Sequence, residues 1–173
     1  MIETKAPMKF APFDQLCIYL GNFQEIAWKQ FREPLGEYNL QLLHPSDADW
    51  QHLLPLVWNK EEYRDQLAWE QEAMKVADVI VQNVDLPGNL TTLFDLGKYS
   101  HSGKIVVYSP VRHKYVEHIC LLHGIPFIDS FRDLVSFVLS VVKYGMAVAP
   151  RSKGKLDLGE VFHQKYPEHT RGG

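Results

Sequence analysis

Two carboxylates in the middle of the chain have positions suited to nucleophilic or acid–base chemistry. Asp95 lies about two turns into a predicted helix, which follows an apolar strand and a Pro/Gly loop. Glu70 lies on the helix that precedes the same strand. Open α/β sheets bind ligands in the crevice outside the carboxyl ends of their strands, close to such helices. We therefore expect Asp95 and Glu70 to carry the function, although the position of Glu70, taken alone, favours a salt-bridged helix residue.

Polar and small residues follow two of the predicted strands and are expected at the same crevice. The first strand ends in Gly21 and Asn22, and the loop after the third strand carries Asp85 and Asn89. Carboxyl ends of parallel strands meet at one edge of a sheet, which would gather these four residues around one opening with Asp95. Asn89 also fits a simple N-cap of the helix that follows it.

The motifs of other common chemistries are absent from the sequence. There is no G-x-G-x-x-G after the first strand, no G-x-x-x-x-G-K-[ST] and no G-x-S-x-G, so we expect no cofactor. His113, His118 and His123 are five residues apart, which scatters them around a helix, and we expect no metal site. Cys17 and Cys120 lie in apolar patterns typical of buried thiols. Carboxylates remain as the reactive groups.

Apolar runs alternate with amphipathic segments along the chain. This alternation predicts an α/β fold, a flavodoxin-like three-layer sandwich with a five-stranded parallel sheet of order 2-1-3-4-5. The strands are predicted at residues 16–20, 38–43, 78–84, 104–108 and 125–128, and the principal helices at 25–31, 60–76, 90–100, 113–123 and 131–144.

Composition indicates one globular domain in a chain of 173 residues, 46% hydrophobic and 23% charged. We predict a flexible arm at 1–14, the α/β domain at 15–149 and a polar tail at 150–173. The net charge of −3 argues against binding to a nucleic-acid polymer. The most apolar window, 134–149, is interrupted by polar residues and is too short to span a membrane. Without a secretory signal, we expect a cytoplasmic protein.

An ordered set of segments in the middle of the chain resembles the nucleoside 2-deoxyribosyltransferase family, and in particular its short, divergent branch. The resemblance covers roughly Ile18 to Val138. The segments are Trp69-Glu70, then Ala77-Asp78-Val79-Ile80-Val81, a Pro/Gly loop, Phe94-Asp95-Leu96-Gly97, and Gly103-Lys104 followed by Val106-Val107.

The resemblance implies roles for several residues. The nucleophile of the family, a glutamate, falls on Asp95, and a second acid on the preceding helix falls on Glu70. A third acid falls on Asn89, and an aromatic residue that steadies the nucleophile falls on Tyr19. The implied function is a transferase or hydrolase that acts on the N-glycosidic bond of a nucleoside, deoxynucleoside or nucleotide. The resemblance also implies a homo-oligomer, a dimer or larger, in which a neighbouring subunit completes the crevice. We expect the tail after Pro150 or the helix from Lys60 at the interface.

Two alternatives remain open at this point. Aspartate in place of glutamate at Asp95, and asparagine in place of aspartate at Asn89, also fit a relative that binds a nucleotide-like ligand as a sensor or partner protein. A larger N-glycoside, such as a nicotinamide dinucleotide, is a further possible substrate. Few basic residues lie near the expected crevice, which favours a nucleoside over a phosphorylated substrate.

Overall fold

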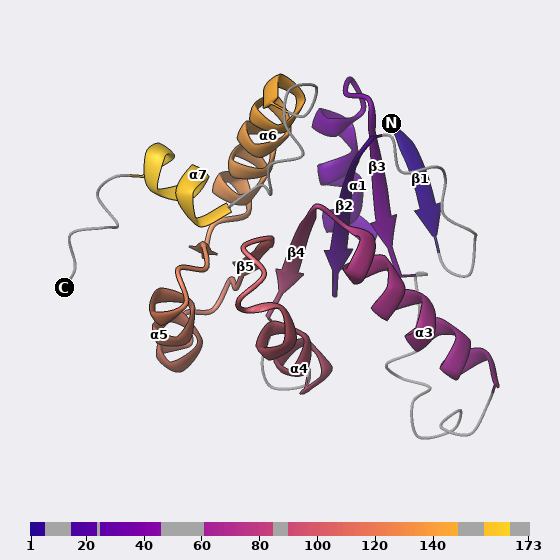
Figure 1. The fold of residues 1–173 in the computed structure, drawn as a ribbon, viewed down its shortest axis with the longest axis horizontal. Coiled ribbons are helices and arrows are strands. Elements are labelled where there is room, and N and C mark those ends of the chain that lie inside the picture. Colours follow the sequence, from indigo (N-terminus) through magenta and orange to yellow (C-terminus); the bar gives the residue numbers. More distant parts are fainter. Residues whose placement is uncertain (6–14, 24, 46–60, 85–89, 149–157, 167–173) are drawn as a thin grey trace. The chain divides into compact units, whose positions relative to one another are not determined.

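The computed structural model describes residues 1–5, 15–23, 25–45, 61–84, 90–148 and 158–166 (Figure 1). The chain divides into two compact units, Met1–Ile80 and Val81–Gly173, each of which contains strands and helices. No helix within the described residues is both long enough and apolar enough to cross a membrane.

The first unit is built around parallel strands with buried side chains. Ile18 pairs opposite Leu42 between β2 and β3, and Thr4 pairs opposite Leu43 between β1 and β3. Near-continuous apolar runs are typical of strands in parallel sheets, which are covered on both faces. The described elements of this unit are β1 (Ile2–Lys5), β2 (Leu16–Gly21), α1 (Glu25–Leu35), β3 (Leu40–His44) and α3 (Glu61–Val76).

Helix α1 is longer than the sequence predicts. A helix over 25–31 was expected to stop before Pro34, but α1 continues to Leu35 with Pro34 inside it. Proline removes one i→i−4 hydrogen bond. In the last turn this loss does not prevent the helix from continuing, because Phe31 and Leu35 are both fully buried and favour the helical path.

The start of β2 is fixed to the residue that precedes β4. The Cys17 backbone N–H donates to the Asp78 Oδ2 over 2.8 Å, and the Asp78 N–H donates to the Cys17 carbonyl, also over 2.8 Å. Cys17 is buried. The Asp78 side chain therefore supplies the hydrogen-bond acceptor for the Cys17 N–H near the start of the strand.

We expect Asp78→Ala to lower the free energy of unfolding by about 1–2 kcal/mol, because the Cys17 N–H loses a charged acceptor. Asp78→Asn keeps an oxygen at the same place and is expected to cost less than half as much. Urea denaturation of both variants measures the difference. Equal losses in the two variants, or no loss in Asp78→Ala, would show that this hydrogen bond does not hold the strand.

The second unit contains the remaining strands and helices. Strand β4 begins at the end of the first unit, and its last residues belong to the second. Val107 pairs opposite Phe127 in the parallel pair β5–β6, and the Val84 N–H donates to the Tyr108 carbonyl over 2.7 Å. The described elements are β4 (Val79–Asn83), α4 (Leu90–Tyr99), β5 (Ile105–Tyr108), α5 (Lys114–Leu122), β6 (Phe127–Ile128), α6 (Phe131–Val148) and α7 (Leu158–Lys165).

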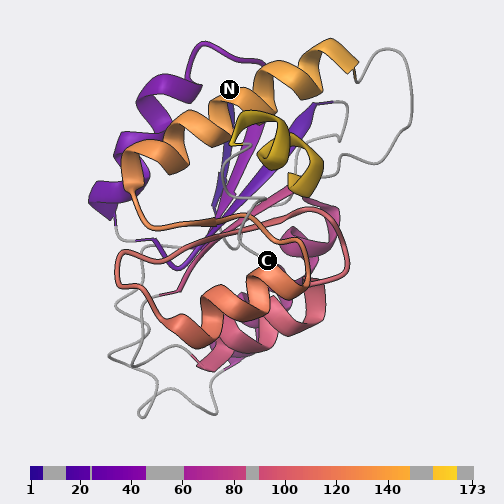
Figure 2. The same cartoon turned by 90° about the vertical axis from the view of Figure 1, so that its left-hand side faces the viewer.

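Helix α6 presents the apolar face that its sequence predicts. Leu134, Phe137, Val138 and Val141 recur at helical spacing and are fully buried. Helix α7 packs against α6 through an edge-to-face contact between the Phe137 and Phe162 rings, whose centroids are 5.6 Å apart (Figure 2). Part of the predicted polar tail is therefore an ordered helix.

The strand order confirms the predicted fold class, with one correction. The sheet has six strands in the order β1-β3-β2-β4-β5-β6. The five predicted strands correspond to β2–β6, and their order, β3-β2-β4-β5-β6, is the predicted order 2-1-3-4-5. The additional edge strand, β1, lies in the segment expected to be a flexible arm. This strand forms by pairing with β3, where the buried Gln41 Nε2 donates to the Thr4 Oγ1 over 2.8 Å. The sequence of β1 has no local apolar periodicity that would predict a strand.

Candidate functional site

Asp95 lies on the buried face of α4. Thr92, Asp95, Leu96 and Tyr99 follow the i, i+3, i+4, i+7 spacing of one helix face, and all four are buried. Asp95 is only 7% exposed, whereas Phe94 beside it is 69% exposed. Aspartate is rarely buried without a specific role, since removing a carboxylate from water costs free energy. The helix thus holds a carboxylate inside the protein and an aromatic ring outside it.

Two further polar residues of the second unit are buried, one on β4 and one on α4. Gln82, next to the last residue of the strand, is 3% exposed, and its Oε1 has no hydrogen-bond partner among the described residues. Thr92, in the first turn of α4, is also buried. A buried acceptor without a partner calls for an explanation, and a missing ligand is one. Both residues were overlooked in the sequence, where nothing distinguishes a buried polar side chain from an exposed one.

Asp85 and Asn89 lie outside the described residues. They belong to the segment 85–89 between β4 and α4. Their predicted contacts with a ligand therefore stay predictions. For Asn89, the alternative role as an N-cap also stays a prediction.

Strand β2 of the first unit contains Tyr19 and ends at Gly21, and Asn22 is the residue that follows it. Tyr19 and Gly21 are buried. Asn22 has a φ of 60°, in the left-handed region that asparagine tolerates better than most residues with a side chain. This conformation ends the strand abruptly, as the Gly21-Asn22 turn predicts.

Glu70 lies on α3, also in the first unit. Its Oε1 accepts a hydrogen bond from the Nε2 of Gln66, one turn earlier, over 2.7 Å. Gln66 is buried and Glu70 is half-buried, with Trp69 beside it in the core. The amide holds the carboxylate in a defined orientation, which suits a residue that positions a substrate.

Comparison with known protein families matches residues 16–112 to the family described as nucleoside 2-deoxyribosyltransferase like. The match covers more than half of the 173 residues. The chain belongs to this family. A comparison with curated proteins finds no match.

Membership of the nucleoside 2-deoxyribosyltransferase-like family connects the chain with glycosyl transfer on nucleosides. All the predicted site residues lie inside the matched segment, and so do Gln82 and Thr92. Helices α5, α6 and α7 and strand β6 lie beyond its end. The match thus ends before the elements that complete the second unit.

Thiol chemistry is not favoured in this member of the family. Neither cysteine forms a disulfide, and both are buried. Burial, with a smaller contribution from Glu117, raises the pKa of Cys120 to about 12, so its thiol stays protonated at neutral pH. Within the described part of the chain, no three side chains of His, Cys, Asp or Glu are grouped to hold a metal ion.

Proposed function

We propose that this protein cleaves the N-glycosidic bond of a nucleoside or deoxynucleoside, with Asp95 as the nucleophile. The observation that carries the proposal is the burial of Asp95 on the inner face of α4, in a chain of the nucleoside 2-deoxyribosyltransferase-like family. A buried carboxylate can stabilise the positive charge that develops on the sugar ring, or capture it as an ester.

The proposed reaction proceeds in two steps. In the first, an Asp95 oxygen forms a bond to the anomeric carbon, the bond from that carbon to the base nitrogen breaks, and the base leaves with the bonding electrons and takes up a proton. In the second, a nitrogen of another base, or water, attacks the anomeric carbon, gives up a proton to the solvent, and releases the Asp95 carboxylate. An acceptor base makes the protein a transferase, and water makes it a hydrolase. Glu70 and Tyr19 retain the supporting roles that the family resemblance implies.

Chromatography of the purified protein with a panel of nucleosides and deoxynucleosides, with and without an acceptor base, tests this function. New nucleosides formed only with the acceptor indicate transfer, and free base formed without it indicates hydrolysis. If the protein binds a nucleoside but releases no base from any of them, the sensor or partner role is correct and the enzymatic proposal is wrong.

We further propose that Gln82 recognises the ligand, because its buried Oε1 can accept a hydrogen bond from an amino or ring N–H of the base. Gln82→Leu is expected to raise KM about tenfold, the equivalent of about 1.4 kcal/mol. The same change removes an unsatisfied buried acceptor, so the melting temperature is expected to stay the same or rise. Steady-state kinetics and thermal unfolding check the two results. A lower melting temperature with an unchanged KM would assign Gln82 to the fold.

We also propose that the protein forms a homo-oligomer. Helix α5 exposes Tyr115, Leu121 and Leu122, and an apolar surface of this kind commonly marks a protein interface. This face differs from α3 and from the C-terminal tail, which were the interfaces predicted from the sequence.

Light scattering at micromolar concentration is expected to show a dimer or a larger oligomer. The double variant Tyr115→Glu/Leu122→Glu should be a monomer, because it places charges in the apolar contact. Lys114→Glu, on the same helix, serves as the control and should leave the oligomer intact. A wild-type monomer would exclude the interface.

A further inference from the structure

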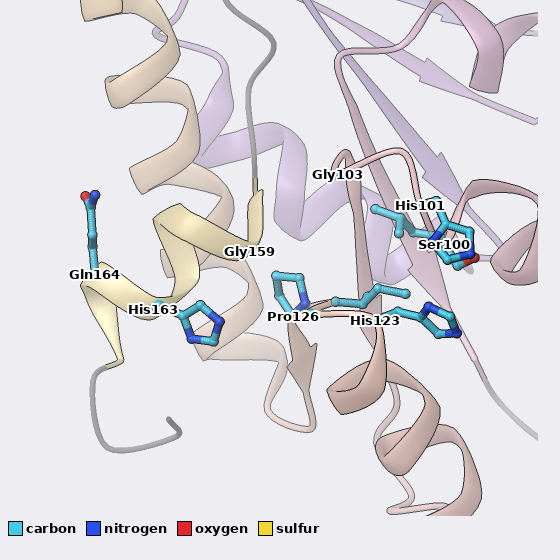
Figure 3. Close-up of a pocket in the computed structure, with 11 residues that line it drawn as sticks. Ser100, His101, Gly103, His123, Pro126, Gly159, His163 and Gln164 are labelled. Atoms are coloured by element: carbon cyan, nitrogen blue, oxygen red, sulfur yellow. The ribbon is translucent and has the colours of Figure 1, made fainter. Parts of the chain in front are cut away.

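The second unit has a hollow of about 710 Å³ at the amino ends of β5 and β6 (Figure 3). Three separate segments line it: the end of α4 with the turn into β5, the turn between α5 and β6, and helix α7. Catalytic crevices of parallel sheets lie at the opposite, carboxyl ends of the strands. Seven of the eleven lining residues follow residue 112, beyond the segment that matches the family. The hollow is therefore separate from the site proposed above, and its role does not depend on the proposed reaction.

Helix α7 is fixed in place as one wall of this hollow. The Leu158 N–H donates to the Gly103 carbonyl over 2.8 Å, which attaches the start of α7 to the turn before β5. At the other end, the Lys165 Nζ donates to the Ser136 carbonyl over 2.6 Å and to the Ser140 Oγ over 2.7 Å, both on α6. These contacts hold His163 and Gln164 at the hollow without using their side chains.

The lining side chains are suited to an anion. His101, His123 and His163 each come from a different segment, and the rings of His101 and His123 meet edge to face with centroids 4.7 Å apart. Gln164 adds an amide, and none of the described lining residues is acidic. Imidazole N–H groups can donate hydrogen bonds to the oxygens of an anion. A metal ion is not favoured, because the described histidines do not form a group of three that could hold one.

The size of the hollow indicates a ligand larger than an inorganic ion. Its volume lies within the range of about 300–1,000 Å³ that is usual for small-molecule sites. Ile105, Ile125 and Pro126 supply an apolar part of the lining, against which the carbon skeleton of a ligand can pack. We propose that this hollow is a second ligand site, which binds a small phosphate monoester with its phosphate at His101 and His123 (Figure 3).

Isothermal titration calorimetry with ribose 5-phosphate, in a phosphate-free buffer, tests the proposal. Ribose 5-phosphate is expected to bind, and ribose, which lacks the phosphate, is not. The double variant His101→Gln/His123→Gln is expected to lose at least about tenfold in affinity, because the hydrogen bonds of both imidazoles to the charged phosphate are removed.

His118→Gln is the matched control, since His118 is exposed on α5 and does not line the hollow. It should bind ribose 5-phosphate like the wild type, and so should Asp95→Ala, whose change lies at the other proposed site. Circular dichroism of the double variant checks its fold, and the two single variants, each expected to bind more weakly than the wild type, replace it if it does not fold. Equal affinity of the wild type and the folded histidine variants, equal binding of ribose and ribose 5-phosphate, or no binding at all would overturn the proposal.

Discussion

Asp95→Ala is expected to reduce turnover of a nucleoside by at least about 10³-fold, because it removes the group that attacks the anomeric carbon. The melting temperature should stay near that of the wild type, because alanine is a good helix former at the centre of α4. Asp95→Asn has almost the same size but no charge, and it should lose as much activity. Asp129→Ala is the control: Asp129 forms an exposed ion pair with Arg112 at 3.1 Å, and its loss should leave turnover unchanged.

Asp95→Glu separates two explanations of the shorter side chain. The family resemblance places a glutamate at this position, and aspartate is one methylene shorter. A displacement of about 1 Å in a reacting group can change a rate on the order of 10²-fold. If the aspartate falls short of the sugar, Asp95→Glu should raise a weak activity by up to about that factor. If α4 lies closer to the sugar to suit aspartate, the longer side chain should lower the rate. An unchanged rate in both Asp95→Ala and Asp95→Glu would show that this carboxylate is not the nucleophile.

Phe137→Ala is expected to lower the free energy of unfolding by about 3–5 kcal/mol, the usual cost of removing a large buried ring. Phe137 is fully buried on α6, and its ring contacts that of Phe162 on α7. The change therefore leaves a cavity in the core and also weakens the attachment of α7. Chemical denaturation measures the loss, and hydrogen exchange measures the protection of the α7 amides.

Phe94→Ala makes the same substitution at an exposed position. It is expected to change the free energy of unfolding by no more than about 0.5 kcal/mol. Similar losses in Phe94→Ala and Phe137→Ala would contradict the packing of α6 and α7 described above.

The main elements of the fold could be predicted from the sequence because their apolar spacing is local. The buried face of α6 follows the helical period, which predicts a helix. Strands β2 and β3 are mostly apolar runs, which predict buried strands. Strand β1 carries no such signal, since Ile2–Lys5 is short and largely polar and becomes a strand by pairing with β3. Pairing between distant segments depends on the tertiary structure, which no local pattern reveals.

The candidate site could be predicted only in part, for a similar reason. Asp95 stands out in the sequence because it is a carboxylate in an otherwise apolar helix face after a strand. Gln82 is as deeply buried, but its importance comes from a missing hydrogen-bond partner, which is a property of the folded protein. His163 reaches the hollow only because α7 folds onto α6, whereas the sequence placed α7 in a polar tail.

The most direct test of the proposed function is to look for the sugar ester on Asp95. The protein is mixed with a 2-deoxyribonucleoside without an acceptor base, quenched rapidly with acid, digested and analysed by mass spectrometry. We expect the mass of a deoxyribosyl group on the peptide that contains Asp95, and its loss when an acceptor base is added before the quench. Release of the base without any adduct on this peptide, or an adduct on a different carboxylate, would contradict the assignment of Asp95 as the nucleophile.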